Sequence, residues 1–172
     1  MRSTLVDEGK AALRGGDLAA ARRAFELALE AGVSGAALEG LAEARYLERE
    51  YSAAAAGYER AYSAYRGEGQ IMAAGRAART VAWITGNVLG DWAVRSGWLA
   101  RARSLLEEAG GDGPEHGWVL ITRAFSEQDA QLRESFLREA VAIGRRSAGD
   151  RAERRCYAPA WDVADAEELA GC

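Results

Sequence analysis

The chain has 172 residues, 49% of them apolar and 28% charged, which suffices for one domain with a continuous core and differs from the composition of disordered chains. Its formal net charge of −4 lacks the basic surplus of a stand-alone nucleic-acid binder, and no apolar run approaches the roughly 18 residues of a membrane-spanning helix. Ala, Gly and Arg abound while Lys10 is the only lysine, which indicates a GC-rich bacterial genome.

The part of the chain that ends at Tyr65 contains a repeated pattern. The segment GDLAAARRAFELALEAG, from Gly16, aligns with REYSAAAAGYERAYSAY, from Arg49, so the repeat has a 33-residue period. In each copy a small residue precedes an aromatic one by four positions, and another small residue follows it by three. These positions are Ala21, Phe25 and Ala28 in the first copy and Ala54, Tyr58 and Ala61 in the second. The spacing predicts helices that approach closely at the small residues, with the aromatic ring filling the remaining volume.

Further helices are predicted along the rest of the chain. The pair Gly15-Gly16 predicts a turn, and Asp17 is a suitable N-cap for the helix that follows it. Pro114 suits the first turn of a later helix. Apolar spacing predicts four more helices, at Ile71–Leu89, Trp92–Glu108, Glu115–Phe125 and Asp129–Arg146. We therefore expect about eight helices, the last one short, and no strands.

The repeat residues resemble the tetratricopeptide signature. Two further strings, GWLARARSLLE at Gly97–Glu107 and GPEHGW at Gly113–Trp118, are similar to the tetratricopeptide region of actinobacterial LuxR-type transcriptional regulators. The resemblance covers residues 5 to 146. It implies an all-α fold, a right-handed superhelix (α-solenoid) of antiparallel helix pairs, that serves as a regulatory module. In that family the module is usually followed by a C-terminal helix-turn-helix that binds DNA.

The pattern divides the chain into a helical repeat domain at 1–146 and an irregular tail at 147–172. Arg151–Trp161 has no repeat register, and Pro159 would break a helix through it. Two explanations remain open. The reading frame could shift near Ser147 and leave a truncated regulator, or the protein is naturally short and its tail forms a capping helix around Ala164–Leu169.

No residue pattern indicates catalysis, a metal or a cofactor. His116 is the only histidine, so a structural or solvated role is favoured over a metal ligand or a catalytic base. The stretches Gly67–Gly69 and Gly110–Gly113 resemble phosphate-binding loops but lack the Lys-Ser/Thr of a P-loop, so interhelical turns are favoured. Cys156 and Cys172 are interpreted as incidental thiols of a reduced, cytoplasmic protein, since the N-terminus has no secretion signal.

A partner surface is predicted on the first helix of each pair, because these helices line the concave side of stacked repeats. Its candidate residues mix charge with aromatic rings, and they are Glu39, Glu43, Tyr46, Arg76, Arg79 and Trp83. Such a groove suits a protein or peptide partner whose carboxylates are gripped by arginine. The alternative interpretation is that these residues lie on ordinary solvent-exposed helix faces without a partner-binding role. The cluster of tryptophans at Trp83, Trp92, Trp98 and Trp118 fits either a core or a groove.

The predicted function is therefore a non-catalytic protein-interaction or effector-sensing module of a bacterial transcriptional regulator. The alternatives are a structural domain for homo-oligomerisation, with a homodimer as the simplest form, and a stand-alone adaptor. Neither a membrane nor direct nucleic-acid binding by this chain is expected. The arginine-rich stretch from Arg145 to Arg155 is interpreted as a solvated helix end and tail, since acidic residues follow it.

Overall fold

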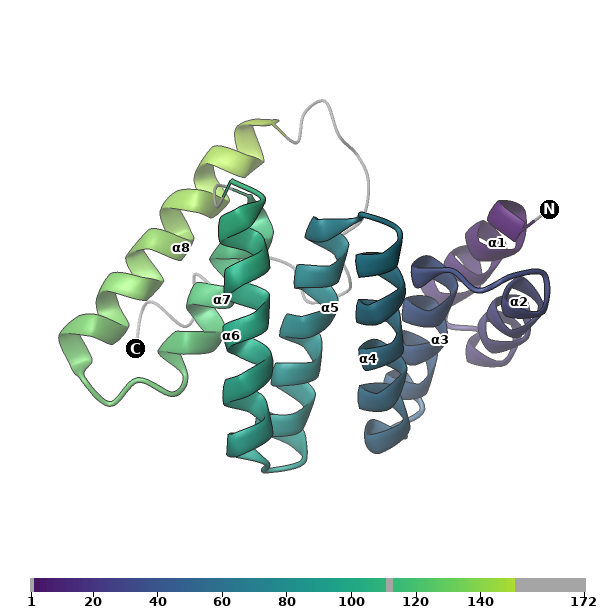
Figure 1. The fold of residues 1–172 in the computed structure, drawn as a ribbon, viewed down its shortest axis with the longest axis horizontal. Helices are drawn as coiled ribbons and strands as arrows, with labels where there is room; N and C mark the ends of the chain where they lie inside the picture. The colour runs from purple at the N-terminus through teal and green to yellow at the C-terminus, as the bar shows by residue number, and fades with distance from the viewer. Residues whose placement is uncertain (1, 111–112, 151–172) are drawn as a thin grey trace. The chain divides into compact units, whose positions relative to one another are not determined.

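The computed structural model describes residues 2–110 and 113–150, and within these ranges it contains helices and no strands (Figure 1). The elements in chain order are α1 (Arg2–Arg14), α2 (Leu18–Glu30), α3 (Gly35–Leu47), α4 (Tyr51–Gly67), α5 (Ile71–Trp83), the π-helical turn η1 (Ile84–Val88), α6 (Trp92–Glu108), α7 (Pro114–Ala124) and α8 (Ala130–Asp150). The predicted all-α fold of about eight helices is confirmed, but the eighth helix is the longest of those described, at 21 residues, and not short.

The chain forms two compact units, which divide between Ala109 and Gly110. In the first unit, each of the helices α1 to α6 packs against the next one in sequence, as expected for a helical repeat. In the second unit, α7 packs against α8. The buried apolar residues follow the same division, because three core clusters lie within the first unit and one lies within the second.

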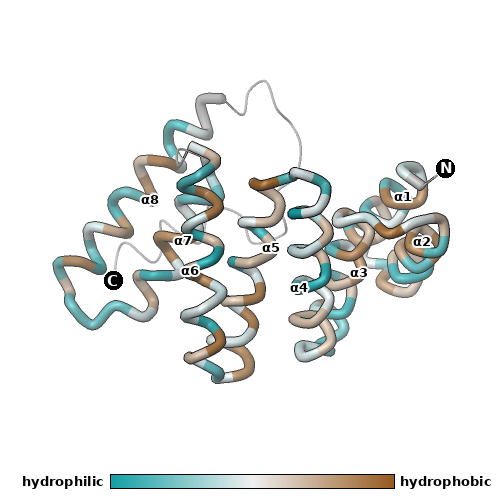
Figure 2. The backbone as a smooth tube through the Cα atoms, viewed as in Figure 1, coloured by the Kyte–Doolittle hydropathy of each residue, from teal (hydrophilic) through white to brown (hydrophobic). Residues whose placement is uncertain are grey.

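The repeat period of the sequence is the period of the first two hairpins. Helices α1 and α3 begin at Arg2 and Gly35, and α2 and α4 begin at Leu18 and Tyr51, so both pairs of starts keep the same 33-residue spacing. The small residues of the signature, Ala21, Ala28, Ala54 and Ala61, have no exposed surface, and the aromatic ones, Phe25 and Tyr58, are also buried. Hydrophobic residues alternate with hydrophilic ones along the helices (Figure 2), as expected for helices with one buried face.

Phe25 lies against the backbones of two other helices. A Cβ added at Gly9 of α1 would lie 2.7 Å from the Phe25 ring, and one added at Gly40 of α3 would overlap it. The ring, which is 0% exposed, therefore requires glycine on both sides. One aromatic side chain of the first repeat thus joins α2 to α1 and to the first helix of the next repeat.

The turns inside the first two hairpins have the same backbone form. Gly16 has φ 77° and Arg49, at the equivalent position of the second hairpin, has φ 65°, both in the left-handed region. The amides that follow donate back to the helix, Asp17 N–H to the Ala12 carbonyl at 3.0 Å and Glu50 N–H to the Arg45 carbonyl at 2.9 Å. This pattern is the Schellman motif, in which glycine normally takes the left-handed position.

Several predicted helix boundaries are confirmed. The Asp17 carboxylate caps α2 by accepting from Ala20 N–H at 2.9 Å, Pro114 is in the first turn of α7, and α6 has the predicted bounds. The predicted helix at Ile71–Leu89 is different, because α5 ends at Trp83 and a π-helical turn replaces its last part. In this turn Leu89 N–H donates to the Ile84 carbonyl at 3.0 Å, five residues back.

At the other end of the described chain, α8 continues to Asp150, beyond the predicted end at Arg146. The rest of the predicted tail, including the proposed capping helix at Ala164–Leu169 and both cysteines, lies outside the described residues.

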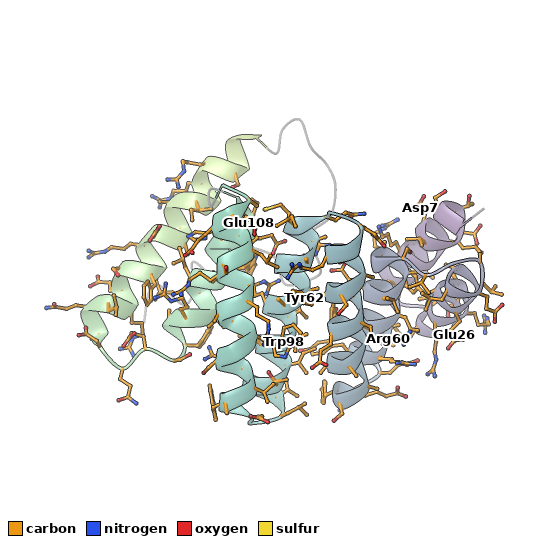
Figure 3. The ribbon with its side chains drawn as sticks, viewed as in Figure 1. Asp7, Glu26, Arg60, Tyr62, Trp98 and Glu108 are labelled. Atoms are coloured by element: carbon orange, nitrogen blue, oxygen red, sulfur yellow. The ribbon has the colours of Figure 1, made fainter. Side chains whose placement is uncertain are left out.

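Aromatic rings also join α4 to α6. Figure 3 shows Tyr62 from α4 and Trp98 from α6 pointing toward each other, and their ring centroids lie 5.1 Å apart at an interplanar angle of 88°. The Arg101 guanidinium lies over the Trp98 ring at 4.9 Å, a distance at which cation–π attraction operates. Trp98 is half-buried and packs against the core, so here the tryptophan serves helix packing.

Candidate partner-binding face

A bidentate ion pair connects α3 with α5. The Glu39 carboxylate accepts from Arg76 Nε and from Arg76 Nη2, both at 2.8 Å. The Tyr65 hydroxyl on α4 donates to the same carboxylate at 2.5 Å. Glu39 is therefore held by donors from two other helices, in the planar geometry that makes Arg–carboxylate pairs strong.

Tyr65 reaches Glu39 because its ring has a fixed place in the core. The ring lies against Gly35 at the start of α3, where an added Cβ would overlap it, and the residue is 3% exposed. Burial, followed by the nearby Glu39 carboxylate, raises the pKa of the Tyr65 hydroxyl, so this hydroxyl remains a donor at every physiological pH.

A second carboxylate lies one helical turn further along α3. Glu43 is half-buried, and its pKa is raised first by burial and then by the negative charge of Glu39, while Arg76 and Lys10 act in the opposite direction. Lys10, Glu43 and Arg79 are each the ninth residue of their helices, α1, α3 and α5. The first helices of three successive helix pairs thus carry a positive, a negative and a positive side chain at the same position of the helix.

Tyr58, a residue of the repeat signature, also belongs to this environment. It is 7% exposed, and burial together with Glu43 and Glu39 raises the pKa of its hydroxyl, while Arg79 and Arg76 lower it. We use the name polar cluster for the group formed by Glu39, Glu43, Tyr58, Tyr65, Arg76 and Arg79.

The structure brings most of the predicted partner residues together at this cluster. Glu39 pairs with Arg76, and Glu43 is adjacent on the same helix. Tyr46 and Trp83 are half-buried and pack against the same core cluster, which contains Tyr58. Tyr46 also makes an edge-to-face contact with the Tyr51 ring at 5.5 Å between centroids.

Arg79 differs from this prediction, because it is 6% exposed and lies in the interior of the fold. Gly75 and Ala82, which share its face of α5 at spacings of four and three residues, are also buried, so the helix face that carries Arg79 packs inward. The Arg76 guanidinium is directed at Glu39. Arg76 is therefore engaged within the fold and Arg79 is buried, and a grip of these arginines on partner carboxylates stays a prediction.

Sequence reasoning missed Tyr65 and the role of the Tyr58 hydroxyl in this cluster. Glu39 and Arg76 are separated by 37 residues, so no spacing rule within one helix links them. Only for Tyr58 does the sequence contain an indication of this role. Its position in the repeat predicts that the side chain is buried, and a buried tyrosine hydroxyl usually has a polar neighbour.

The tryptophans of the predicted cluster divide by exposure. Trp92 is 53% exposed, whereas Trp83, Trp98 and Trp118 are half-buried.

His116 lies in the first turn of α7 and is half-buried. Within the described residues no group of three or more His, Cys, Asp or Glu side chains could hold a metal ion.

A pocket of about 680 Å³ lies between the start of α1, the segment before α3 and the turn after α4. Its lining includes Asp7, Val33 and Glu68. The Glu68 carboxylate already accepts from Gly35 N–H at 2.7 Å and from the Gln70 amide at 3.0 Å. This carboxylate therefore caps the start of α3 from within the fold.

None of the helices in the described ranges is long and apolar enough to span a bilayer.

In comparisons with known proteins, no protein-family model matches the chain, and no curated protein matches it.

Proposed function

We propose that the chain is a non-catalytic protein-interaction or effector-sensing module of the tetratricopeptide type, belonging to a cytoplasmic bacterial transcriptional regulator. The observation that carries the proposal is the polar cluster, in which the half-buried Glu43 of α3 lies beside the ion pair of Glu39 with Arg76 from α5. The sequence strings that resemble LuxR-type regulators support the regulatory part of the proposal.

Glu43 is the residue of this cluster best suited to contact a partner. It is half-buried, so a partner can reach it, and it is adjacent to the half-buried ring of Tyr46 on the same helix. Burial disfavours its charged form, and a donor supplied by a partner would offset that cost. Partner contact at Glu43 and Tyr46 replaces the arginine fork expected from the sequence.

Affinity capture from the native cell tests the proposal, with the whole chain as bait. We compare the wild type with Glu43→Lys and with Glu59→Lys, a matched charge reversal at a half-buried glutamate on α4. Recovery of the partner is expected to fall at least tenfold for Glu43→Lys and to stay unchanged for Glu59→Lys. Thermal unfolding of each variant checks that the fold is intact.

Equal recovery of the partner by all three proteins would remove the polar cluster as a binding face. Size-exclusion chromatography with light scattering addresses the alternative of homo-oligomerisation. A dimer that persists at all concentrations, and that Glu43→Lys converts to a monomer, would replace the partner-binding proposal with self-association.

A further inference from the structure

The contact between α3 and α4 places a carboxylate beside a buried tyrosine. A Cβ added at Gly57 of α4 would lie 2.8 Å from the Cβ of Ala42, so the two helices are very close at this point. The next residue on each helix belongs to the polar cluster, Glu43 on α3 and Tyr58 on α4. After burial, the charge of Glu43 is the largest influence that raises the pKa of the Tyr58 hydroxyl. The carboxylate and the hydroxyl are therefore neighbours.

Neither of these two groups has a hydrogen-bond partner in the part of the chain that the structure describes. Tyr58 is 7% exposed, yet its hydroxyl forms no hydrogen bond with a described residue. Among the same residues, none donates to the Glu43 carboxylate or forms an ion pair with it. Glu39, one turn earlier on α3, is different because it accepts from both Arg76 and Tyr65. Buried polar groups normally have partners, so Glu43 and Tyr58 together suit a ligand that donates hydrogen bonds.

The charges around Glu43 favour a ligand that is also positive. Burial and Glu39 raise the pKa of Glu43, and Arg76 and Lys10, which act in the opposite direction, do not compensate for them. A cation supplied from outside would stabilise the charged carboxylate. An anion would instead meet two carboxylates, because Arg76 is already engaged by Glu39 and Arg79 is only 6% exposed.

Aromatic rings lie next to this carboxylate. Tyr46 follows Glu43 by three residues and shares its face of α3, and Trp83 of α5 packs against the same core cluster as Tyr46. Both side chains are half-buried, so part of each remains exposed. Aromatic rings attract ammonium and guanidinium groups, and they also cover the aliphatic stem that carries such a group. The surroundings of Glu43 therefore suit an organic cation on an aliphatic chain.

A protein segment fits this position better than a free amine. None of the side chains around Glu43 lines the pocket of about 680 Å³ near Glu68, and Glu43 lies along a helix face. Small molecules bind tightly where a cavity buries most of their surface, whereas a peptide gains further contacts along the helices beside its anchor.

We infer that the polar cluster binds a lysine or arginine side chain of a partner protein. The Glu43 carboxylate pairs with its charge, the Tyr58 hydroxyl accepts a second hydrogen bond, and Tyr46 and Trp83 contact its aliphatic stem. The inference rests on the proposed function, and it adds the chemistry of the group by which the partner is recognised.

A phage-displayed library of random peptides, selected on the full chain, tests the inference. Selected peptides are expected to share a lysine or arginine at one position. Selection on Glu43→Gln should lose this enrichment. Glu59→Gln, which removes the same charge from a half-buried position of α4, should keep it. This matched pair separates recognition at Glu43 from the general attraction of basic peptides to a chain of net charge −4.

One selected peptide then measures the contact in a double-mutant cycle. Replacing its shared basic residue with norleucine is expected to weaken binding to the wild type by about tenfold or more, and binding to Glu43→Gln by less than about threefold. Tyr58→Phe, which removes only the hydroxyl, should weaken binding of the original peptide by about threefold. Thermal unfolding of each variant checks that the fold is intact.

Three results would overturn the inference. The first is a set of selected peptides that share aspartate or glutamate, which would favour a grip by the arginines. The second is a shared basic residue whose contribution Glu43→Gln does not change, and the third is a selection that yields no shared residue.

The capture experiment from the native cell separates this inference from the proposed function. Partner recovery that depends on Glu43, combined with selected peptides that lack a basic residue, would retain the binding face and remove the cation. Peptide binding that depends on Glu43, combined with unchanged recovery by Glu43→Lys, would remove the proposed function and retain the chemistry of the site.

Discussion

At the scale of single residues, the glycines of this fold differ in how much space surrounds them for a side chain. Gly40 is buried in α3, where a Cβ would overlap the Phe25 ring, whereas Gly67 at the end of α4 has no heavy atom within 4 Å of the same position. Close helix contact is thus one reason for the many glycines in the chain, and it applies only at particular positions.

We predict that Gly40→Ala lowers the free energy of unfolding by about 1–3 kcal/mol, because the added methyl group overpacks the core around Phe25. Gly67→Ala is the matched control, and it should be neutral or stabilising by about 0.5 kcal/mol because alanine favours the helix. Urea unfolding of both variants measures the difference. Equal effects would contradict the packing of Phe25 between α1 and α3.

Arg49 offers a stabilising substitution. Its φ of 65° is costly for any residue with a Cβ, and its side chain is exposed. Arg49→Gly is expected to raise the free energy of unfolding by about 0.5–1 kcal/mol. At the equivalent position of the first hairpin, replacing glycine by a residue with a Cβ, as in Gly16→Ala, should lower the free energy of unfolding by about 1 kcal/mol. Thermal melts that showed the same sign for both substitutions would disprove the equivalence of these two turns.

At the scale of elements, the ion pair between Glu39 and Arg76 couples α3 to α5 across the boundary between two hairpins. The two side chains are 18% and 34% exposed, so water screens them less than a surface pair. A double-mutant cycle with Glu39→Gln and Arg76→Gln should give a coupling energy of about 1–2 kcal/mol.

The pair of Glu134 with Arg138 on α8 provides a comparison for that cycle. Its side chains are 59% and 76% exposed, and the same cycle there should give a coupling of about 0.5 kcal/mol or less. Similar coupling energies for the two pairs would show that the Glu39–Arg76 contact does not stabilise the packing of α3 against α5.

The raised pKa of Glu43 predicts how stability depends on pH. A carboxyl group whose pKa is higher in the folded state favours folding when it is protonated, and that contribution is lost as the pH rises through the raised pKa. Ionised Glu43 therefore destabilises the fold at pH 7. Glu43→Gln should raise the melting temperature at pH 7, and its advantage should disappear by about pH 4, where glutamate is largely protonated. An advantage that stayed constant with pH would contradict the burial of this carboxylate.

At the scale of the whole molecule, the first unit contains complete core clusters of its own. We predict that a fragment of residues 1–109 folds and unfolds cooperatively, because Leu105 is the last apolar residue of these three clusters. Circular dichroism during heating measures this, with the full chain as the reference. A fragment without a cooperative transition would show that the second unit is required for the first.

The sequence predicts this architecture where the physics is local. The repeat period, the cap at Asp17 and the bounds of α6 follow from side-chain spacing and turn chemistry, and the structure confirms them. The contact of Glu39 with Arg76 depends on how one hairpin packs on the next, which spacing does not encode. The π-helical turn was missed because its residues keep the apolar spacing of an ordinary helix.

The place of Phe25 has a consequence for how such a chain could lengthen or shorten in evolution. The ring rests on Gly9, while Ala42, the residue at the equivalent position of the second hairpin, lies in the same core cluster as Tyr58. Because Phe25 also needs Gly40 in the following helix, deleting the second repeat or duplicating the first would place a helix without this glycine against the Phe25 ring. The unit that can be exchanged is therefore larger than the period visible in the sequence.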